Sequence, residues 1–395
     1  MKALRYGWII VGVGLFVKMS ALGFGRFAYS MLLPSMRDSL RFNYTQMGLL
    51  SGGILLGYLL FSFIGGILTT RFGSKRIVVT SLVCSSLSMF FLSRVSSFLL
   101  LLGFTFAMGG AAAGAHISMT TLPMSWFTKR RLGRALGIVT GGTGLGILTT
   151  GFLLPLLLTS LGKEAWRTCW VVMASITLAI AVAGSVLLKE KPGESGLPFV
   201  ETMAPQEPLP NAGKGAMLNV RTIFAVYFVF GFSYIIYATY FVAFMIEGLH
   251  LNEKAAGDIW AVFGWTCMAS GLIWGFLSDR VGRRRALLWN NGIISLAVFL
   301  PLSFQQPLFL AVSTFLFGLT FLGTVTIVAA SIGDLVGERR ASVYGLVTLI
   351  HGIGQLLGTT SGGYLKDLTG SFQVTFIASL ARFLLCFFVI AFEKK

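Results

Sequence analysis

Long apolar runs dominate the chain, and short polar segments separate them. Most of the runs reach the ~20 residues that an α-helix needs to cross the hydrocarbon core of a bilayer. The pattern predicts an all-α integral membrane protein whose twelve transmembrane helices cover residues 6–34, 45–70, 77–93, 98–127, 135–160, 167–188, 222–247, 256–277, 286–304, 308–334, 342–364 and 372–392.

Composition supports this interpretation. Of the 395 residues, 55% are hydrophobic and 11% are charged, and the mean hydropathy is +0.82. A soluble protein of this length would need more polar surface. Lys2 and Arg5 precede the first run, which is too long for the core of a signal peptide and lacks a convincing cleavage site, so we expect it to remain as a span.

The formal net charge is +17, and its distribution predicts an orientation. If the N-terminus lies in the cytoplasm, the polar segments on that side hold 21 of the 31 Lys and Arg residues, and the opposite side holds seven. This is the positive-inside bias, and an even number of spans then places both termini in the cytoplasm. We therefore expect a multi-pass protein of the bacterial inner (plasma) membrane, with the lipid bilayer as its surroundings. The basic residues lie in short turns without interleaved aromatic residues, so nucleic acid is not an expected partner.

The chain repeats itself. The polar segment 189–221 predicts a cytoplasmic linker between an N-terminal six-helix bundle (1–188) and a C-terminal one (222–395), which match at an offset of about 208 residues. Asn43 before the second run corresponds to Asn252 before the eighth, and both are expected helix caps. The strongest match joins GGILTTRFGSKR (65–76) to WGFLSDRVGRRR (274–285). Such a duplication is typical of transporters built from two halves around a site near the bilayer midplane.

The second of these segments resembles the signature loop of the major facilitator superfamily, Gly-x-Leu-x-Asp-Arg-x-Gly-Arg-Arg, and WFTKRRLGRALG (126–137) resembles the loop that follows it. The resemblance covers nearly the whole chain and implies two pseudo-symmetric six-helix bundles around a central cavity. It also implies a gating role for Gly66, Arg71, Gly73, Arg76, Gly275, Asp279, Arg280, Gly282 and Arg283. Thr70 stands where the family has an acid in the first copy, which implies a less firmly held gate on that side.

Charged side chains within the runs point to the substrate. None of the 14 acidic residues lies at the centre of a run, yet Lys18 and Arg26 lie within the first run and Arg382 lies within the twelfth. A cation at the bilayer centre costs at least ~2.5–3.5 kcal/mol, and such residues usually face a cavity or a partner. Because the chain supplies no acid at that depth, the simplest partner is an anion that binds and leaves.

Depth along the helices groups several polar side chains. At about 1.5 Å per residue, Lys18 lies roughly 15 Å from Trp8, near the midplane, and His116 and His351 reach a similar depth. Arg26 lies roughly 27 Å from Trp8, close to the outer surface, where we expect it to attract anions. The candidate substrate-binding residues are Lys18, Arg26, Tyr29, His116, Thr143, Tyr234, Tyr237, His351 and Gln355. Each class also has a structural interpretation, because lysines snorkel or sit neutral, histidines serve as interhelical donors and tyrosines pack.

The sequence predicts a secondary transporter of a small organic anion. A monocarboxylate is the preferred substrate, because GFGRFAYSMLLPSM (23–36) and related segments resemble an uncharacterised bacterial branch near the monocarboxylate and oxalate/formate carriers. We expect either proton-coupled symport, with His116, His351 or Lys18 as the titrating group, or anion exchange. The alternatives are an exporter of lipophilic or drug-like compounds and a transporter-like membrane sensor. No catalytic constellation suggests an enzyme, no cofactor is expected, and three histidines without a ligand cluster predict no metal site. We expect a monomer.

Overall fold

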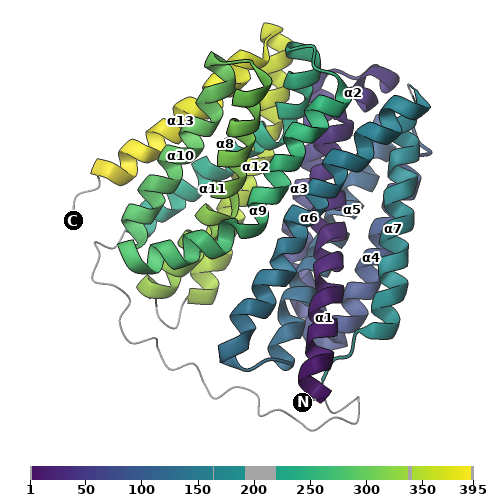
Figure 1. Ribbon diagram of the computed structural model, residues 1–395, viewed down its shortest axis with the longest axis vertical. Helices are drawn as coiled ribbons and strands as arrows, with labels where there is room; N and C mark the ends of the chain where they lie inside the picture. Colours follow the sequence, from purple (N-terminus) through teal and green to yellow (C-terminus); the bar gives the residue numbers. More distant parts are fainter. Residues whose placement is uncertain (1, 163, 192–218, 337–339, 393–395) are drawn as a thin grey trace. The chain divides into compact units, whose positions relative to one another are not determined.

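The computed structural model of the chain describes residues 2–162, 164–191, 219–336 and 340–392. These residues fold into helices joined by short connections, and no strand occurs among them (Figure 1). They form twelve long helices, of which eleven are long and apolar enough to cross a membrane. The remaining one, α12 (Arg340–Thr369), has 30 residues and is more polar, because it carries His351, Gln355 and several hydroxyl side chains. The prediction of an all-α membrane fold with twelve spans is confirmed.

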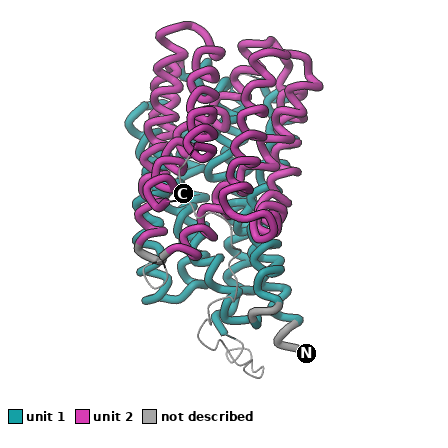
Figure 2. The backbone as a smooth tube through the Cα atoms, turned by 90° about the vertical axis from the view of Figure 1, so that its left-hand side faces the viewer, with its two compact units in different colours: residues 1–40, 53–208 teal, residues 41–52, 209–395 magenta. Residues whose placement is uncertain are grey.

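The chain divides into two compact units (Figure 2): unit 1 comprises residues 1–40 and 53–208, and unit 2 comprises residues 41–52 and 209–395. The first residues of α3 thus group with unit 2, which the predicted bundles (1–188 and 222–395) did not anticipate. Most of the predicted linker, 189–221, lies outside the described residues.

Unit 1 begins with a single long span in three parts. It runs from α1 (Lys2–Lys18) through a π-helix, η1 (Met19–Phe27), into α2 (Ala28–Leu40). The other elements of unit 1 are the later part of α3 (Tyr44–Phe72), α4 (Ser74–Leu92), α5 (Phe98–Thr121), the short 3₁₀ turn η2 (Leu122–Ser125), α6 (Lys129–Leu161) and α7 (Ala165–Leu187).

Unit 2 contains the start of α3 and six further spans. These are α8 (Val220–Ala243) with the π-helical end η4 (Phe244–Gly248), α9 (Glu253–Val281), α10 (Arg283–Ser303), α11 (Pro307–Val336), α12 and α13 (Phe372–Phe392).

The π-helix changes the length of the first span. The Ala28 N–H donates to the carbonyl of Gly23, five residues back, so the ladder is wider here than in an α-helix. The helical span continues to Leu40 and covers 36 residues from Arg5, whereas the apolar pattern predicted an end near residue 34.

The duplication predicted from the sequence is visible in backbone detail. The side chain of Asn252 accepts from the N–H of Ala255 at 2.8 Å, and Asn43 accepts from Gln46 N–H at the same distance, so both predicted caps are confirmed. Gly73 and Gly282 share φ +89° with ψ 152° and 150°. An L side chain rarely adopts this conformation, which explains glycine at the tight turn of both signature loops.

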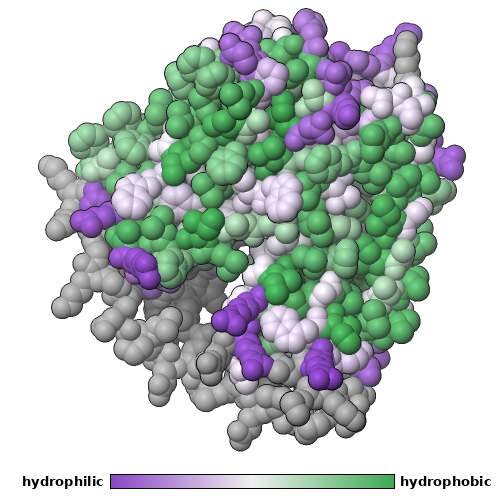
Figure 3. Space-filling model, in the orientation of Figure 1, coloured by the Kyte–Doolittle hydropathy of each residue, from purple (hydrophilic) through white to green (hydrophobic). Residues whose placement is uncertain are grey.

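The helix surfaces are apolar. Figure 3 shows one face on which hydrophobic side chains cover most of the helices, while strongly hydrophilic side chains gather towards helix ends. Large apolar side chains are widely exposed, including Phe63 at 78% and Leu99 at 74%. Soluble proteins rarely expose contiguous apolar surface on this scale. The chain is a multi-pass membrane protein.

Candidate functional site

Lys18 is fully enclosed within unit 1. It ends α1 and is 1% exposed. Its Nζ lies 2.8 Å from Nδ1 of His116, 3.1 Å from the His116 carbonyl oxygen and 2.7 Å from Oγ1 of Thr120. An ammonium group has three donors, and these three acceptors use all of them. Because Nδ1 of His116 accepts, a neutral His116 ring carries its proton on Nε2.

No acidic side chain hydrogen-bonds Lys18 in the part of the chain that the structure describes. The surroundings are apolar instead: Val17, Met119 and Val139 belong to a buried apolar cluster to which α1, α4, α5, α6 and α7 contribute. A cation in such surroundings, held by neutral acceptors alone, leaves a positive potential that an anion can satisfy.

Arg26 joins this group through an aromatic ring. Its guanidinium carbon lies 5.4 Å from the ring centre of Tyr58, and the Tyr58 ring meets the His116 ring edge to face at 6.1 Å. We call Lys18, Arg26, Tyr58, His116 and Thr120 the cationic cluster. Arg26 lies in the π-helical part of the 36-residue span, and its expected position near the outer surface stays a prediction.

Glycines of α6 bring that helix against Lys18. A Cβ atom added to Gly142 would collide with the Leu15 carbonyl and with Cβ of Lys18, and one added to Gly146 would collide with the Gly23 backbone. α6 therefore approaches the first span closely at these two glycines. Thr143, the next residue after Gly142, is 2% exposed.

Unit 2 contains a second polar group, formed by Tyr234 of α8 with His351 and Gln355 of α12. The amide nitrogen of Gln355 lies 2.6 Å from Nε2 of His351 and 2.9 Å from the Tyr234 hydroxyl. Nδ1 of His351 lies 3.0 Å from the carbonyl of Tyr227, whose ring stacks on the imidazole at 4.1 Å. The carbonyl can only accept, so Nδ1 carries the proton and Nε2 accepts from the amide. We call Tyr234, His351 and Gln355 the amide cluster.

The two remaining predicted tyrosines are buried. Tyr237 is fully buried, its hydroxyl bonds Ser313 at 2.6 Å, and its ring stacks on Phe317 at 4.1 Å. It therefore belongs to the packing of α8 against α11 rather than to the amide cluster. Tyr29 is 1% exposed in α2, beyond the π-helix.

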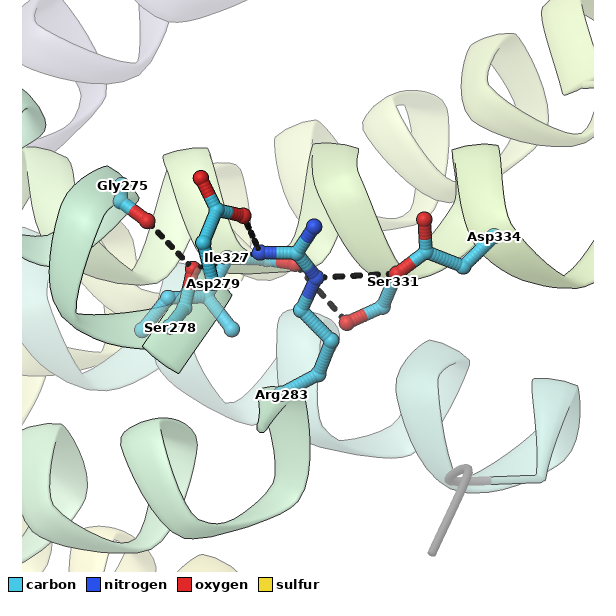
Figure 4. A network of polar contacts seen from close by, with 7 residues as sticks. All are labelled: Gly275, Ser278, Asp279, Arg283, Ile327, Ser331 and Asp334. Carbon is cyan, nitrogen blue, oxygen red and sulfur yellow. Dashed lines mark hydrogen bonds and ion pairs between the residues drawn. The ribbon is translucent and has the colours of Figure 1, made fainter. Parts of the chain in front are cut away.

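Ion pairs between side chains hold the second signature loop. Figure 4 shows Arg283, at the start of α10, reaching towards Asp279 of α9 and Asp334 of α11. Its Nε donates to Asp334 at 2.9 Å, and its Nη1 donates to Asp279 and, at 2.7 Å, to Ser278. The side chains of Arg283 and Asp334 are 21% and 23% exposed. The family resemblance pointed to Asp279 and Arg283, but Asp334 could not be recognised, since it lies 51 residues further along the chain.

The ion pairs of Arg283 have no counterpart at the matching positions of the first signature loop. Thr70 and Ser74 stand at the positions of Asp279 and Arg283, and the hydroxyl of Thr70 bonds the carbonyl of Gly66 within its own helix at 3.0 Å. A different carboxylate takes part: Oε1 of Glu190, just after α7, accepts from the N–H of Lys75 in the first turn of α4 at 2.5 Å. Glu190 also lies against Gly73, where an added Cβ would meet it at 2.6 Å.

The other gating candidates lie at the helix ends that flank the loops: Gly66 and Arg71 in α3, Arg76 in α4, and Gly275 and Arg280 in α9. Sequence reasoning missed Thr120, Tyr58 and Glu190. For Thr120 a signal existed, because it follows His116 by one helical turn.

Known proteins resemble the chain over most of its length. A family model described as "Uncharacterised MFS-type transporter YbfB" matches residues 18–391. The hexuronate transporter of Bacillus subtilis (strain 168) is 25% identical over 378 residues, which cover 89% of this chain and 86% of that protein. Monocarboxylate transporter 11 of Homo sapiens is 26% identical over 400 residues, covering 95% and 80%.

Among solved structures, a bacterial homologue of the human lysosomal transporter Spinster, in an inward-facing and unoccupied conformation, superimposes with a TM-score of 0.75. It is 15% identical, and the match covers 98% of this chain and 97% of that one. At this identity the likeness concerns the fold alone.

Proposed function

Because the chain belongs to the major facilitator superfamily of transporters, in the family described as "Uncharacterised MFS-type transporter YbfB", we propose that it moves a small organic anion, a monocarboxylate, by alternating access. Two relatives support an anion, since a hexuronate and a monocarboxylate each carry a carboxylate. The observation that carries the proposal is Lys18, a buried cation whose three hydrogen bonds all go to neutral acceptors.

Lys18 acts on the substrate through His116. Its own donors are occupied, so the atom offered to a carboxylate is the Nε2–H of His116, whose orientation the Lys18 bond fixes. His116 and Arg26 are partly exposed, whereas Lys18 is not. The substrate carboxylate therefore accepts from His116 and pairs with the Arg26 guanidinium, and the Lys18 charge stabilises it from behind the ring.

The amide cluster carries the coupling proton in this proposal. A second proton on His351 would break its bond from the Gln355 amide, unless the amide turns and offers its oxygen instead. His116 is the poorer candidate, because a proton on Nδ1 would place two cations 2.8 Å apart. Proton coupling through His351 is therefore preferred to His116, and anion exchange with a permanently charged Lys18 is the rival mechanism.

We also propose the membrane, the orientation and the oligomeric state of the transporter. The bias of basic residues supports a bacterial inner membrane with both termini in the cytoplasm. The transporter is proposed to act as a monomer, since the fold supplies both halves of the repeat in one chain.

A thermal-shift screen of the purified protein tests the substrate class. Small carboxylates, phosphates, sugars and cationic dyes are compared, and stabilisation follows RT ln(1 + [L]/Kd). We expect monocarboxylates to give the largest shift. Preferential stabilisation by lipophilic cations would overturn the anion proposal and favour an exporter. For coupling, a pH gradient alone should drive uptake into liposomes, and His351→Gln should abolish it. A strict need for an opposing anion load would instead establish exchange.

A further inference from the structure

Unit 2 has an apolar groove on its surface. Its volume is ≈ 480 Å³, within the range of ligand-sized pockets. The walls come from Ile273 and Leu277 of α9, Leu288, Trp289 and Gly292 of α10, and Phe387 of α13. Ile273 and Trp289 are 45% and 50% exposed, so the groove opens to the surroundings. In a membrane protein this lining suits a hydrocarbon chain.

Two arginines continue the walls of the groove at one end. Arg280 follows Leu277 by three residues and Ile273 by seven, near the end of α9. Arg285 precedes Trp289 by four residues and Gly292 by seven, in the first turn of α10. Side chains at these spacings share one helix face. Both residues therefore lie on the groove-lining faces of their helices, and both are exposed.

The loop network does not use these two cations. Arg283 takes both carboxylates, Asp279 and Asp334, and Arg284 donates to the carbonyls of Ile390 and Ala391. Within the described ranges, neither Arg280 nor Arg285 forms an ion pair, and the Arg280 guanidinium rests on the Phe276 ring at 4.1 Å. Beyond the groove-lining residues, α9 and α10 thus carry two arginines with which no described acid forms an ion pair.

We propose that this groove binds an anionic glycerophospholipid, with one acyl chain in the groove and the phosphate on Arg280 and Arg285. Charge complementarity selects this occupant: inorganic phosphate would leave the apolar walls uncovered, and a zwitterionic lipid would not offset the two charges. Basic pockets between helices at the cytoplasmic side are known to take anionic headgroups. The bound lipid joins α9 to α10 across the Gly282 turn. This inference does not depend on the identity of the transported substrate.

The test measures thermal stability of the delipidated full-length protein in detergent during titration with phosphatidylglycerol, phosphatidylcholine of the same chains, or inorganic phosphate. Phosphatidylglycerol should stabilise most, and phosphate should have no effect. Two cations near a membrane surface are worth roughly 30-fold, so the double variant Arg280→Gln/Arg285→Gln should need roughly 30-fold more phosphatidylglycerol. The matched control is Arg71→Gln/Arg76→Gln, which removes the corresponding pair from the first signature loop and should leave the titration unchanged.

A second variant tests the groove itself. An added Cβ at Gly292 would meet Phe387 at 3.6 Å, an ordinary contact, so Gly292→Leu should fold and fill the groove. It should abolish the response to phosphatidylglycerol although both arginines remain. An unchanged response in Gly292→Leu or in the arginine double variant would overturn the proposal, and so would equal stabilisation by phosphatidylcholine or by phosphate. If Gly292→Leu does not fold, native mass spectrometry of the wild type and the arginine variant with phosphatidylglycerol decides.

Discussion

Exchange of Lys18 for methionine should weaken binding of a carboxylate substrate roughly 50-fold. In the proposed arrangement, the carboxylate lies one imidazole ring and one hydrogen bond beyond the 2.8 Å contact between Lys18 and His116, roughly 7 Å from Nζ. At an effective dielectric constant of about 20, two unit charges at that separation attract by roughly 2.4 kcal/mol. Each 1.4 kcal/mol is about a factor of ten in affinity, which gives the expected loss.

The variant should still fold. A cation in a span costs at least ~2.5–3.5 kcal/mol on insertion, and the substitution of Lys18 by methionine removes that cost. Against this gain, Nδ1 of His116 and Oγ1 of Thr120 lose their donor, at about 1–3 kcal/mol. Thr120 keeps its own bond to the His116 carbonyl. Because the two contributions are of similar size, we expect the melting temperature of Lys18→Met to change by only a few degrees.

The assay is a binding isotherm in detergent at fixed pH and salt, with the carboxylate that ranks first in the ligand screen. Arg382→Met is the matched control: it removes another cation from a span, one that bonds the Ala378 carbonyl in α13, and should leave affinity unchanged. Lys18→Arg should retain more affinity than Lys18→Met, although a planar guanidinium cannot reproduce the three bonds of an ammonium. A Lys18→Met affinity within about threefold of the wild type would refute the electrostatic reasoning.

Three further predictions concern the loops. Asp334→Asn should lower the free energy of unfolding by about 1–2 kcal/mol, because Arg283 loses a half-buried charged acceptor, and should slow transport; unchanged thermal stability and uptake would contradict this role. Glu190→Gln keeps an acceptor but removes the charge at the start of α4, so the free energy of unfolding should fall by about 0.3–1 kcal/mol in denaturant titrations. An unchanged free energy of unfolding would mean that the charge does not stabilise the fold. The pKa of Glu164 is lowered, first by the hydrogen bond from Ser39 and then by the hydrogen bond from Arg167. The Glu164 carboxylate therefore stabilises the fold fully above the ordinary carboxyl pKa, and this contribution disappears as pH falls through the lowered pKa. Ser39→Ala should shrink that acid dependence of the melting temperature, and an identical pH profile would refute the assignment.

The sequence was sufficient for features that have local causes. The number of long apolar runs predicts the number of spans, because each run that crosses a bilayer satisfies its backbone groups by forming a helix. The asparagine caps and the paired glycines at 73 and 282 were readable for the same reason: each satisfies a geometric need within a few residues of itself. Comparing the two halves then showed that these local devices occur twice.

Features that depend on distant partners were not readable. The engagement of Lys18 by Thr120 joins positions 102 residues apart, and the contact of Glu190 with the first loop joins positions 115 residues apart. No local pattern encodes such distances. The end of the first span was misjudged for a different reason: the apolar run marked where the hydrophobic residues end, while the helix continues through polar positions to Leu40.

The π-helix in the first span contains about one more residue per turn than an α-helix. If the ladder between Lys18 and Arg26 re-formed with four-residue spacing, everything beyond it would rotate by about 100° about the helix axis and advance by about 1.5 Å for each residue released. That rotation would carry the Arg26 guanidinium away from Tyr58 while the contacts of Lys18 with α5 stayed in place. Such a change of register would withdraw one of the two charges from the cationic cluster without unfolding the span.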